Sequence, residues 1–148
     1  MTREQKLSEY IIGRINTPLV WGVSDCCLFV ADALHAMTGK DIASWFRGEY
    51  STRGKAFEML RKFAGGSVKE TVEELARVFE MDKITADIAM QPGDMVLLRA
   101  AACDPIAERL SNGLTVGIVG FDDIGILSQG KDGLVIHTDA EVLSAWRI

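Results

Sequence analysis

The chain has few of the residues that most often form catalytic and metal sites. Its 148 residues include two histidines and three cysteines, with no C-x-x-C pair that would indicate zinc. The cysteines are Cys26, Cys27 and Cys103, which is an odd number. Cys26 and Cys27 are adjacent, and adjacent cysteines seldom form a disulfide with each other. We therefore expect no structural disulfide, no metal site and no cofactor.

The chain also lacks concentrated positive charge and long apolar runs. Its net charge is −5 and its lysines and arginines are scattered. Because phosphate neutralisation needs a concentrated basic surface, nucleic acid is not an expected partner. No apolar run reaches the roughly 18 residues that span a bilayer, and the charged residues 1–5 are unlike a secretory signal. We expect no membrane partner and a protein that is cytoplasmic at synthesis.

Capping residues and apolar periodicity predict helices in the first half of the chain. These cover residues 3–15, 26–37, 41–48, 52–65 and a stretch that begins after Ser67. Short apolar runs between turn residues predict strands at residues 95–98, 114–119, 124–127, 134–138 and 145–148, with a loop or irregular helix at 100–112. Helices followed by antiparallel strands predict one α+β domain over residues 1–148, with the sheet packed on the 26–37 helix.

The expected helix at residues 26–37 begins with a thiol. Ser24 and Asp25 are both good N-cap residues, so Cys26 falls in the first turn. Only Asp32 and His35 are polar between residues 26 and 37, which predicts a helix buried on most sides. The helix dipole and free N–H groups at this end favour a thiolate. Cys26 is therefore either a cysteine nucleophile or a small buried apolar residue, while Cys27 is expected in the core.

A cysteine nucleophile usually needs an imidazole to take its proton. His35 lies nine residues after Cys26, which places it roughly on the opposite face of the helix and about 13 Å along the axis. This geometry excludes His35 as the partner. His137 falls on a predicted strand, where it is either a catalytic base or an ordinary strand residue.

Three motifs give the chain a resemblance to a known family. They are Trp21-Gly22-x-x-Asp25-Cys26, the Pro92-Gly93-Asp94 turn and the Val116-Gly117-Ile118 strand, in the order seen in NlpC-type papain-like cysteine peptidases. The chain is more closely similar to an uncharacterised family of phage and prophage proteins, encoded among tail genes, that looks like a branch of this fold. The matching segments there are residues 21–32, Gly48-Glu49-Tyr50 and Ala145-Trp146-Arg147. The resemblance covers residues 3–148 and implies a papain-like fold.

The resemblance also implies roles for individual residues. Cys26 matches the nucleophile, and its backbone N–H would help to stabilise an oxyanion. Thr115 stands where the peptidases have their general-base histidine, and the third polar residue falls near Ser128 or Gln129. Because threonine cannot act as a base near neutral pH, the resemblance implies a degenerate, tail-associated protein whose cleft survives as a binding or assembly surface.

Two alternatives remain open from the same resemblance. One is an active cysteine endopeptidase or amidase that cleaves peptidoglycan stem peptides, using Cys26 with His137 as a relocated base. The other is a non-enzymatic virion module that binds another phage tail protein. The expected partners are therefore peptidoglycan stem peptides or a tail protein, and the expected final location is a phage tail.

Overall fold

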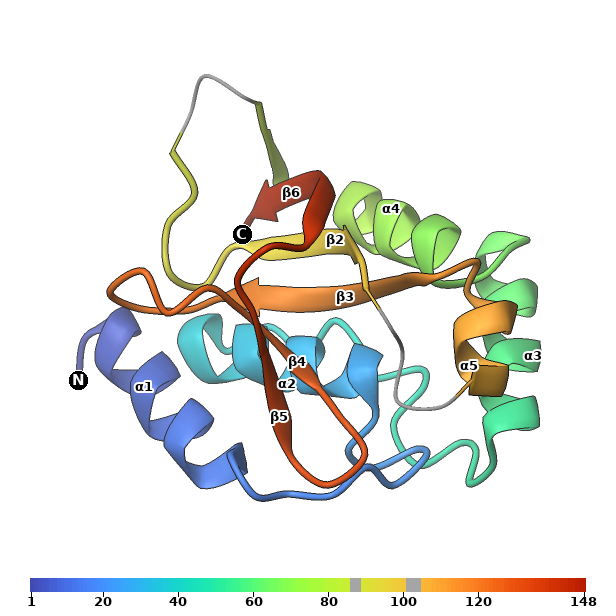
Figure 1. Ribbon diagram of the computed structural model, residues 1–148. Helices are drawn as coiled ribbons and strands as arrows, with labels where there is room; N and C mark the ends of the chain where they lie inside the picture. Colours follow the sequence, from blue (N-terminus) through green and yellow to red (C-terminus); the bar gives the residue numbers. More distant parts are fainter. Residues whose placement is uncertain (86–88, 101–104) are drawn as a thin grey trace.

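The structure is a computed structural model that describes residues 1–85, 89–100 and 105–148 (Figure 1). Cys103 lies outside these residues. The described helices are α1 (Arg3–Arg14), α2 (Cys26–Thr38), α3 (Arg53–Ala64), α4 (Val68–Val78) and α5 (Pro105–Leu110). The described strands are β1 (Asp82–Ile84), β2 (Met95–Arg99), β3 (Leu114–Val119), β4 (Ile126–Gln129), β5 (Leu134–His137) and β6 (Glu141–Arg147).

The described strands form one six-stranded sheet in the order β1-β6-β2-β3-β4-β5. Every neighbouring pair is antiparallel. The strand that comes last in the sequence, β6, lies between β1 and β2 rather than at an edge. The expected α+β architecture, with helices first and an antiparallel sheet afterwards, is confirmed.

Helix α2 is the central helix, and its ends form where the sequence predicts. The Asp25 side chain accepts a hydrogen bond from the Leu28 backbone N–H at 3.1 Å, which caps the first turn. Gly39 ends the helix in the left-handed region, with φ of 79°. The helix packs against α1, β3 and β4 (Figure 1). Its apolar composition is explained by contact on several sides.

The other long helices also begin at capping residues. Thr2 and Gln5 form a capping box at α1, and Ser67 and Glu70 form one at α4. Thr52 caps α3 through the Lys55 N–H. Each of these caps joins residues three apart, so each is determined by local sequence.

Residues 41–48 are not the short helix that the sequence predicts. They form consecutive turns, because Asp41 accepts from the Ala43 N–H at one end and the Gly48 N–H donates to the Gly22 carbonyl at 3.0 Å at the other. Phe46 packs in the core, whereas Trp45 is 60% exposed and its ring makes an edge-type contact with that of Phe63.

Three strands also differ from expectation. Strand β1 has no counterpart in the prediction because it is three residues long and polar at two of them. Strand β4 begins at Ile126 rather than at residue 124, since the preceding residues form a turn in which Asp122 and Asp123 have positive φ. Strand β6 begins at Glu141, four residues before the predicted start.

The two faces of the sheet are covered differently. One face joins the helices in the main core, to which the strands contribute the following buried residues: Met95, Leu97, Leu114, Val116, Ile118, Leu127 and Trp146. The other face, called here the far face, has a separate apolar cluster of Val96, Leu98, Ile126 and Ala145. Among the described residues, this far-face cluster contains only strand and loop residues. The helices thus cover one side of the sheet.

None of the helices in the described parts of the chain combines the length and apolar character that a bilayer-spanning helix requires.

We expect Gly22→Ala to destabilise the fold far more than Gly48→Ala. Both glycines have positive φ, but a Cβ on Gly22 would lie 1.8 Å from the Tyr50 carbonyl oxygen, whereas a Cβ on Gly48 meets nothing within 4 Å. The backbone strain alone costs about 1 kcal/mol, and the collision raises the loss at Gly22 to about 3 kcal/mol or more. Urea denaturation of both variants measures the difference. Equal losses would show that this contact is not a constraint.

Candidate functional site

The loop before α2 is fixed by Ser24 and Asp25, which have separate roles. The Ser24 hydroxyl donates to the Pro18 carbonyl at 2.8 Å and accepts from the Val20 N–H at 3.1 Å. It therefore stabilises the approach to the helix, whereas Asp25 is the cap. Cys26 follows as the first residue of α2, in the position that the sequence predicts.

The Asp25 carboxylate is buried, with 2% of its surface exposed, and it accepts three hydrogen bonds. Leu28 N–H donates to Oδ1 at 3.1 Å, and Gly22 N–H donates to Oδ2 at 3.0 Å. The Tyr50 hydroxyl donates to Oδ2 at 2.5 Å. Burial, with the nearby Asp25 carboxylate, raises the pKa of Tyr50 far above its usual range, so the phenol stays a donor. These bonds fix the backbone around Cys26.

A small cavity of about 20 Å³ lies beside Cys26 and is lined by Thr115 and Gln129 as well. The structure therefore brings together three of the five site residues that the sequence predicts. The rest of the lining comes from Trp21, Phe57, Val68, Ala107, Ser111 and Leu114. A cavity of this size has room for about one water molecule. It does not have room for a peptide group.

The Gln129 carboxamide forms hydrogen bonds that have a structural role. Its Nε2 donates to the carbonyls of Thr17 and Gly130 at 2.8 and 2.9 Å, and its Oε1 accepts from Arg14 at 3.2 Å. Both amide hydrogens are therefore used. Gln129 links β4 to α1 and to the loop before α2.

Ser128 and His137 form a separate pair. The Ser128 hydroxyl and His137 Nε2 are 2.7 Å apart. Because successive side chains on a strand point to opposite faces, Ser128 points away from the side on which Gln129 meets the cavity. His137 lies with Ser128 on the far side of β4, and neither lines the Cys26 cavity. The structure does not bring these two predicted residues to the thiol.

Cys27 is a partly buried residue packed against the main core, as expected. A hydrogen bond with Cys26, together with burial, raises the pKa of the Cys27 thiol well above its ordinary value. Cys27 therefore stays protonated near neutral pH. Of the two thiols at the helix start, only Cys26 lines the cavity.

Two residues of this region are not among the site residues that the sequence predicts. Tyr50 belongs to the matched Gly48-Glu49-Tyr50 segment, but nothing in the pattern shows that it contacts Asp25. Ser111 lines the cavity with 2% of its surface exposed, and its hydroxyl donates to the Glu108 carbonyl at 3.2 Å. It falls in a stretch predicted only as a loop or irregular helix, so the sequence offers no indication of this position.

Within the described ranges, no group of three or more His, Cys, Asp or Glu side chains is placed to hold a metal ion. The geometry defines an α+β domain in which a buried, capped helix start holds a thiol against two strands of an antiparallel sheet. The chain belongs to the family described as a domain of unknown function, DUF6950, whose model matches residues 1–148. A comparison with curated proteins found no match.

Tyr50→Phe tests the bond to Asp25, because it removes the hydroxyl and keeps the ring. We expect it to lower the free energy of unfolding by about 2 kcal/mol, the range for a hydrogen bond to a charged group. The matched variant is Tyr10→Phe, which loses a bond of 2.9 Å to the neutral Phe29 carbonyl and should lose about 1 kcal/mol. Thermal or urea denaturation compares the two. A smaller loss at Tyr50 than at Tyr10 would contradict the role given to Asp25.

His137 should make stability depend on pH. Burial lowers the pKa of His137 below its ordinary value of about 6.5. The unfolded chain therefore takes up a proton more readily, and stability is lost as the pH falls from about 6.5 through the lower folded-state pKa. We expect the free energy of unfolding to fall over this range, and the fall to be smaller in His137→Gln. The control is His35→Gln, since His35 is exposed. An identical pH profile in all three proteins would contradict the expectation.

Proposed function

We propose that this domain is a degenerate relative of NlpC-type papain-like cysteine peptidases, and that it serves as a binding or assembly component of a phage or prophage tail. Three features support the proposal. The thiol of Cys26 begins a buried central helix, the Pro92-Gly93-Asp94 turn leads into β2, and Val116-Gly117-Ile118 lies in β3 beside α2. These segments occur in the order that the resemblance requires.

One observation carries the proposed loss of activity, namely that the Cys26 cavity contains no base. Besides Cys26, the polar residues among the described ones that line it are Thr115, Gln129 and Ser111. The chain has two histidines. His35 is exposed near the other end of α2, and His137 is bonded to Ser128.

Hydrolysis by a thiol needs a base that takes its proton and an acid that protonates the leaving amine. Neither a threonine hydroxyl nor a carboxamide does this near neutral pH. The cavity of about 20 Å³ next to Cys26 has room for about one water molecule and not for a whole substrate peptide. These facts support a structural role for the helix start, in which Asp25 holds the loop at Gly22, the first turn of α2 and Tyr50 together.

The active alternative needs His137 to reach Cys26. His137 pairs with Ile126 across the β4–β5 ladder and is bonded to Ser128 on the side of β4 away from Gln129. To reach the thiol, the imidazole would have to leave both neighbours and pass to the other face of the strand. The arrangement therefore favours a degenerate protein over an active enzyme that uses His137 as a relocated base.

Purified peptidoglycan tests the choice directly. We expect the protein to release no more soluble fragments than its Cys26→Ala variant, because no base activates the thiol. We also expect iodoacetamide to alkylate Cys26 at the same rate in the parent and in His137→Ala, with the labelled cysteine located by peptide mass mapping.

Two results together would overturn the proposed loss of activity. Fragment release that is abolished by both Cys26→Ala and His137→Ala would establish the active enzyme. Alkylation of Cys26 that slows at least about tenfold in His137→Ala, with an unchanged rate in His35→Ala, would show that the imidazole reaches the thiol.

A further inference from the structure

A cleft of about 680 Å³ lies on the far face of the sheet, away from the Cys26 cavity. This volume is within the range of about 300–1,000 Å³ that is usual for ligand sites. The cleft is built from the end of β3, the β3–β4 turn, the start of β4, the end of β5, the β5–β6 connection, β6 and the segment before β2. Its lining residues are Met90, Pro92, Val119, Gly120, Asp122, Asp123, Gly125, Ile126, His137, Thr138, Ala140 and Val142.

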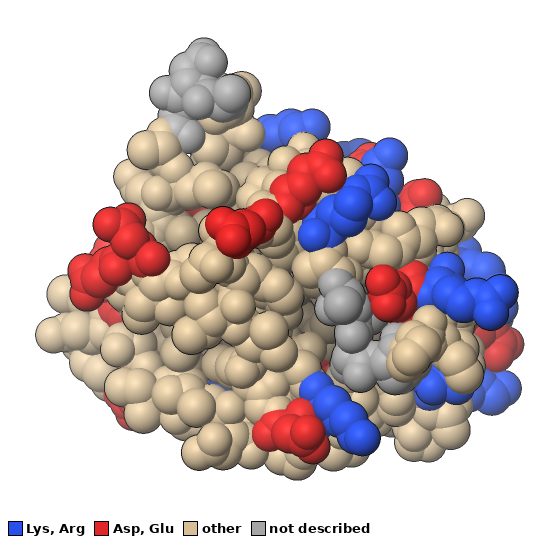
Figure 2. Space-filling view, viewed as in Figure 1, with Lys and Arg blue, Asp and Glu red and all other residues tan. Residues whose placement is uncertain are grey.

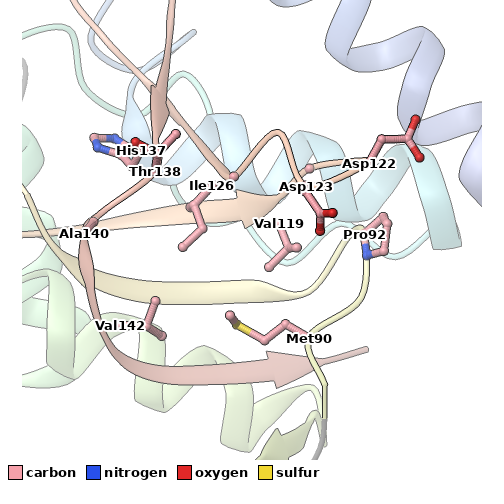
Figure 3. A pocket seen from close by; sticks show the side chains of 12 residues that line it. Met90, Pro92, Val119, Asp122, Asp123, Ile126, His137, Thr138, Ala140 and Val142 are labelled. Carbon is pink, nitrogen blue, oxygen red and sulfur yellow. The ribbon is translucent and has the colours of Figure 1, made fainter.

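The floor of the cleft is apolar. In Figure 3 the side chains of Val119, Ile126, Val142 and Met90 point toward one another across the floor. The first three belong to the far-face cluster or pack against it, and Met90 is 43% exposed. An apolar surface that the described helices leave uncovered is typical of an interaction site.

The rim of the cleft is acidic. Asp122 and Asp123 are exposed and form the tip of the β3–β4 turn. The Asp123 carboxylate points toward the floor beside Pro92, whereas the Asp122 carboxylate points away from the cleft (Figure 3). Figure 2 shows red carboxylate side chains at the left end of the molecule, where this turn lies in Figure 1. An acidic rim attracts cations and repels phosphates and anionic lipid surfaces.

The described residues that line the cleft bring no positive charge to this rim. Of the described residues that line the cleft, none is a lysine or arginine. The only other titratable side chain among them is that of His137, and burial lowers its pKa, so the ring is neutral near pH 7. The cleft therefore combines an apolar floor with negative charge at one side.

The cleft continues into a second hollow of about 440 Å³, which shares Met90 and Val142 with it. The remaining lining of the second hollow is Ile84, Thr85, Ala89, Leu143, Ser144 and Ala145. Because they share these two residues, the two hollows adjoin on the far face, and together they are called here the groove. A groove that runs through two such volumes fits an extended chain better than a compact small molecule.

We propose that this groove binds a segment of a partner polypeptide in which apolar side chains flank a lysine or arginine. The apolar side chains cover Val119, Ile126 and Val142, and the cation lies beside Asp123. The inference goes beyond the proposed function, since it uses no residue of the Cys26 cavity. If the protein proved to be an active thiol enzyme, the groove proposal would still stand. If the groove proved to bind nothing, the proposal of a degenerate peptidase would still stand.

A random dodecapeptide library, selected against the whole folded protein, tests the occupant. We expect the selected peptides to be enriched in lysine or arginine next to apolar residues. The tightest peptide is then synthesised with a fluorescent label, and its dissociation constant is measured by anisotropy for the parent and for four variants.

The first pair of variants tests the rim. Asp123→Asn should weaken binding about two- to fivefold, the effect of one exposed charge pair. Asp122→Asn removes the same charge from the same turn but from a side chain that points away, so it should weaken binding less than about twofold. Asparagine tolerates positive φ, so both variants keep the turn.

The second pair tests the floor. Met90→Lys places a cation among the apolar side chains and should weaken binding at least about tenfold. Its control is Ile12→Lys on α1, where the replaced side chain is 68% exposed and lies outside the groove, so the affinity should stay unchanged. Both substituted positions are exposed, and circular dichroism confirms that the variants are folded.

Several outcomes overturn the proposal. Selected peptides without an excess of basic residues would show that the acidic rim does not choose the partner. Equal effects of Asp122→Asn and Asp123→Asn would show that the cation does not lie beside Asp123. Displacement of the peptide by phenethylamine at a similar dissociation constant would assign the site to a small amine. A dimer of the protein that Met90→Lys converts to a monomer would assign it to a second copy.

Discussion

The buried Asp25 carboxylate is the interaction on which the rest of the structure depends. A charge away from water is costly unless donors surround it, and here the donors come from the loop at Gly22, the first turn of α2 and the ring of Tyr50. Three segments must therefore be in place together before the helix start is stable. The close approach of Gly22 to the Tyr50 carbonyl follows from the same arrangement, since only a residue without Cβ lets the two backbones meet.

Strand β4 separates two sides of the molecule that have different roles. Gln129 points toward α1 and the Cys26 cavity, where its amide ties the strand to the loop. Ser128 points the other way and fixes His137 at the edge of the far face. Thus the polar residues that a sequence comparison groups into one catalytic set are divided between a small cavity on the helix side and an open groove on the other.

The parts that the sequence predicts well are those set by neighbouring residues. The caps at Thr2, Asp25 and Ser67 each act over three positions, so the starts of α1, α2 and α4 follow from local chemistry. The turns at 41–48 depend on a bond to Gly22, far away in the chain, and the contact between Tyr50 and Asp25 joins residues 25 apart. The sequence leaves open whether Ser128 or Gln129 faces Cys26, because the answer depends on where β4 begins. That start follows a turn in which Asp122 and Asp123 have positive φ.

The position of β6 has a consequence for how the chain folds during synthesis. β6 follows every other element in the sequence, yet it pairs with both β1 and β2 in the interior of the sheet. While a ribosome still holds this segment, β2 has one unpaired edge and carries the apolar residues Val96 and Leu98 on the far face. Such an edge is prone to pair with other chains. The helices can form as they emerge, but the sheet closes only after β6 has left the exit tunnel.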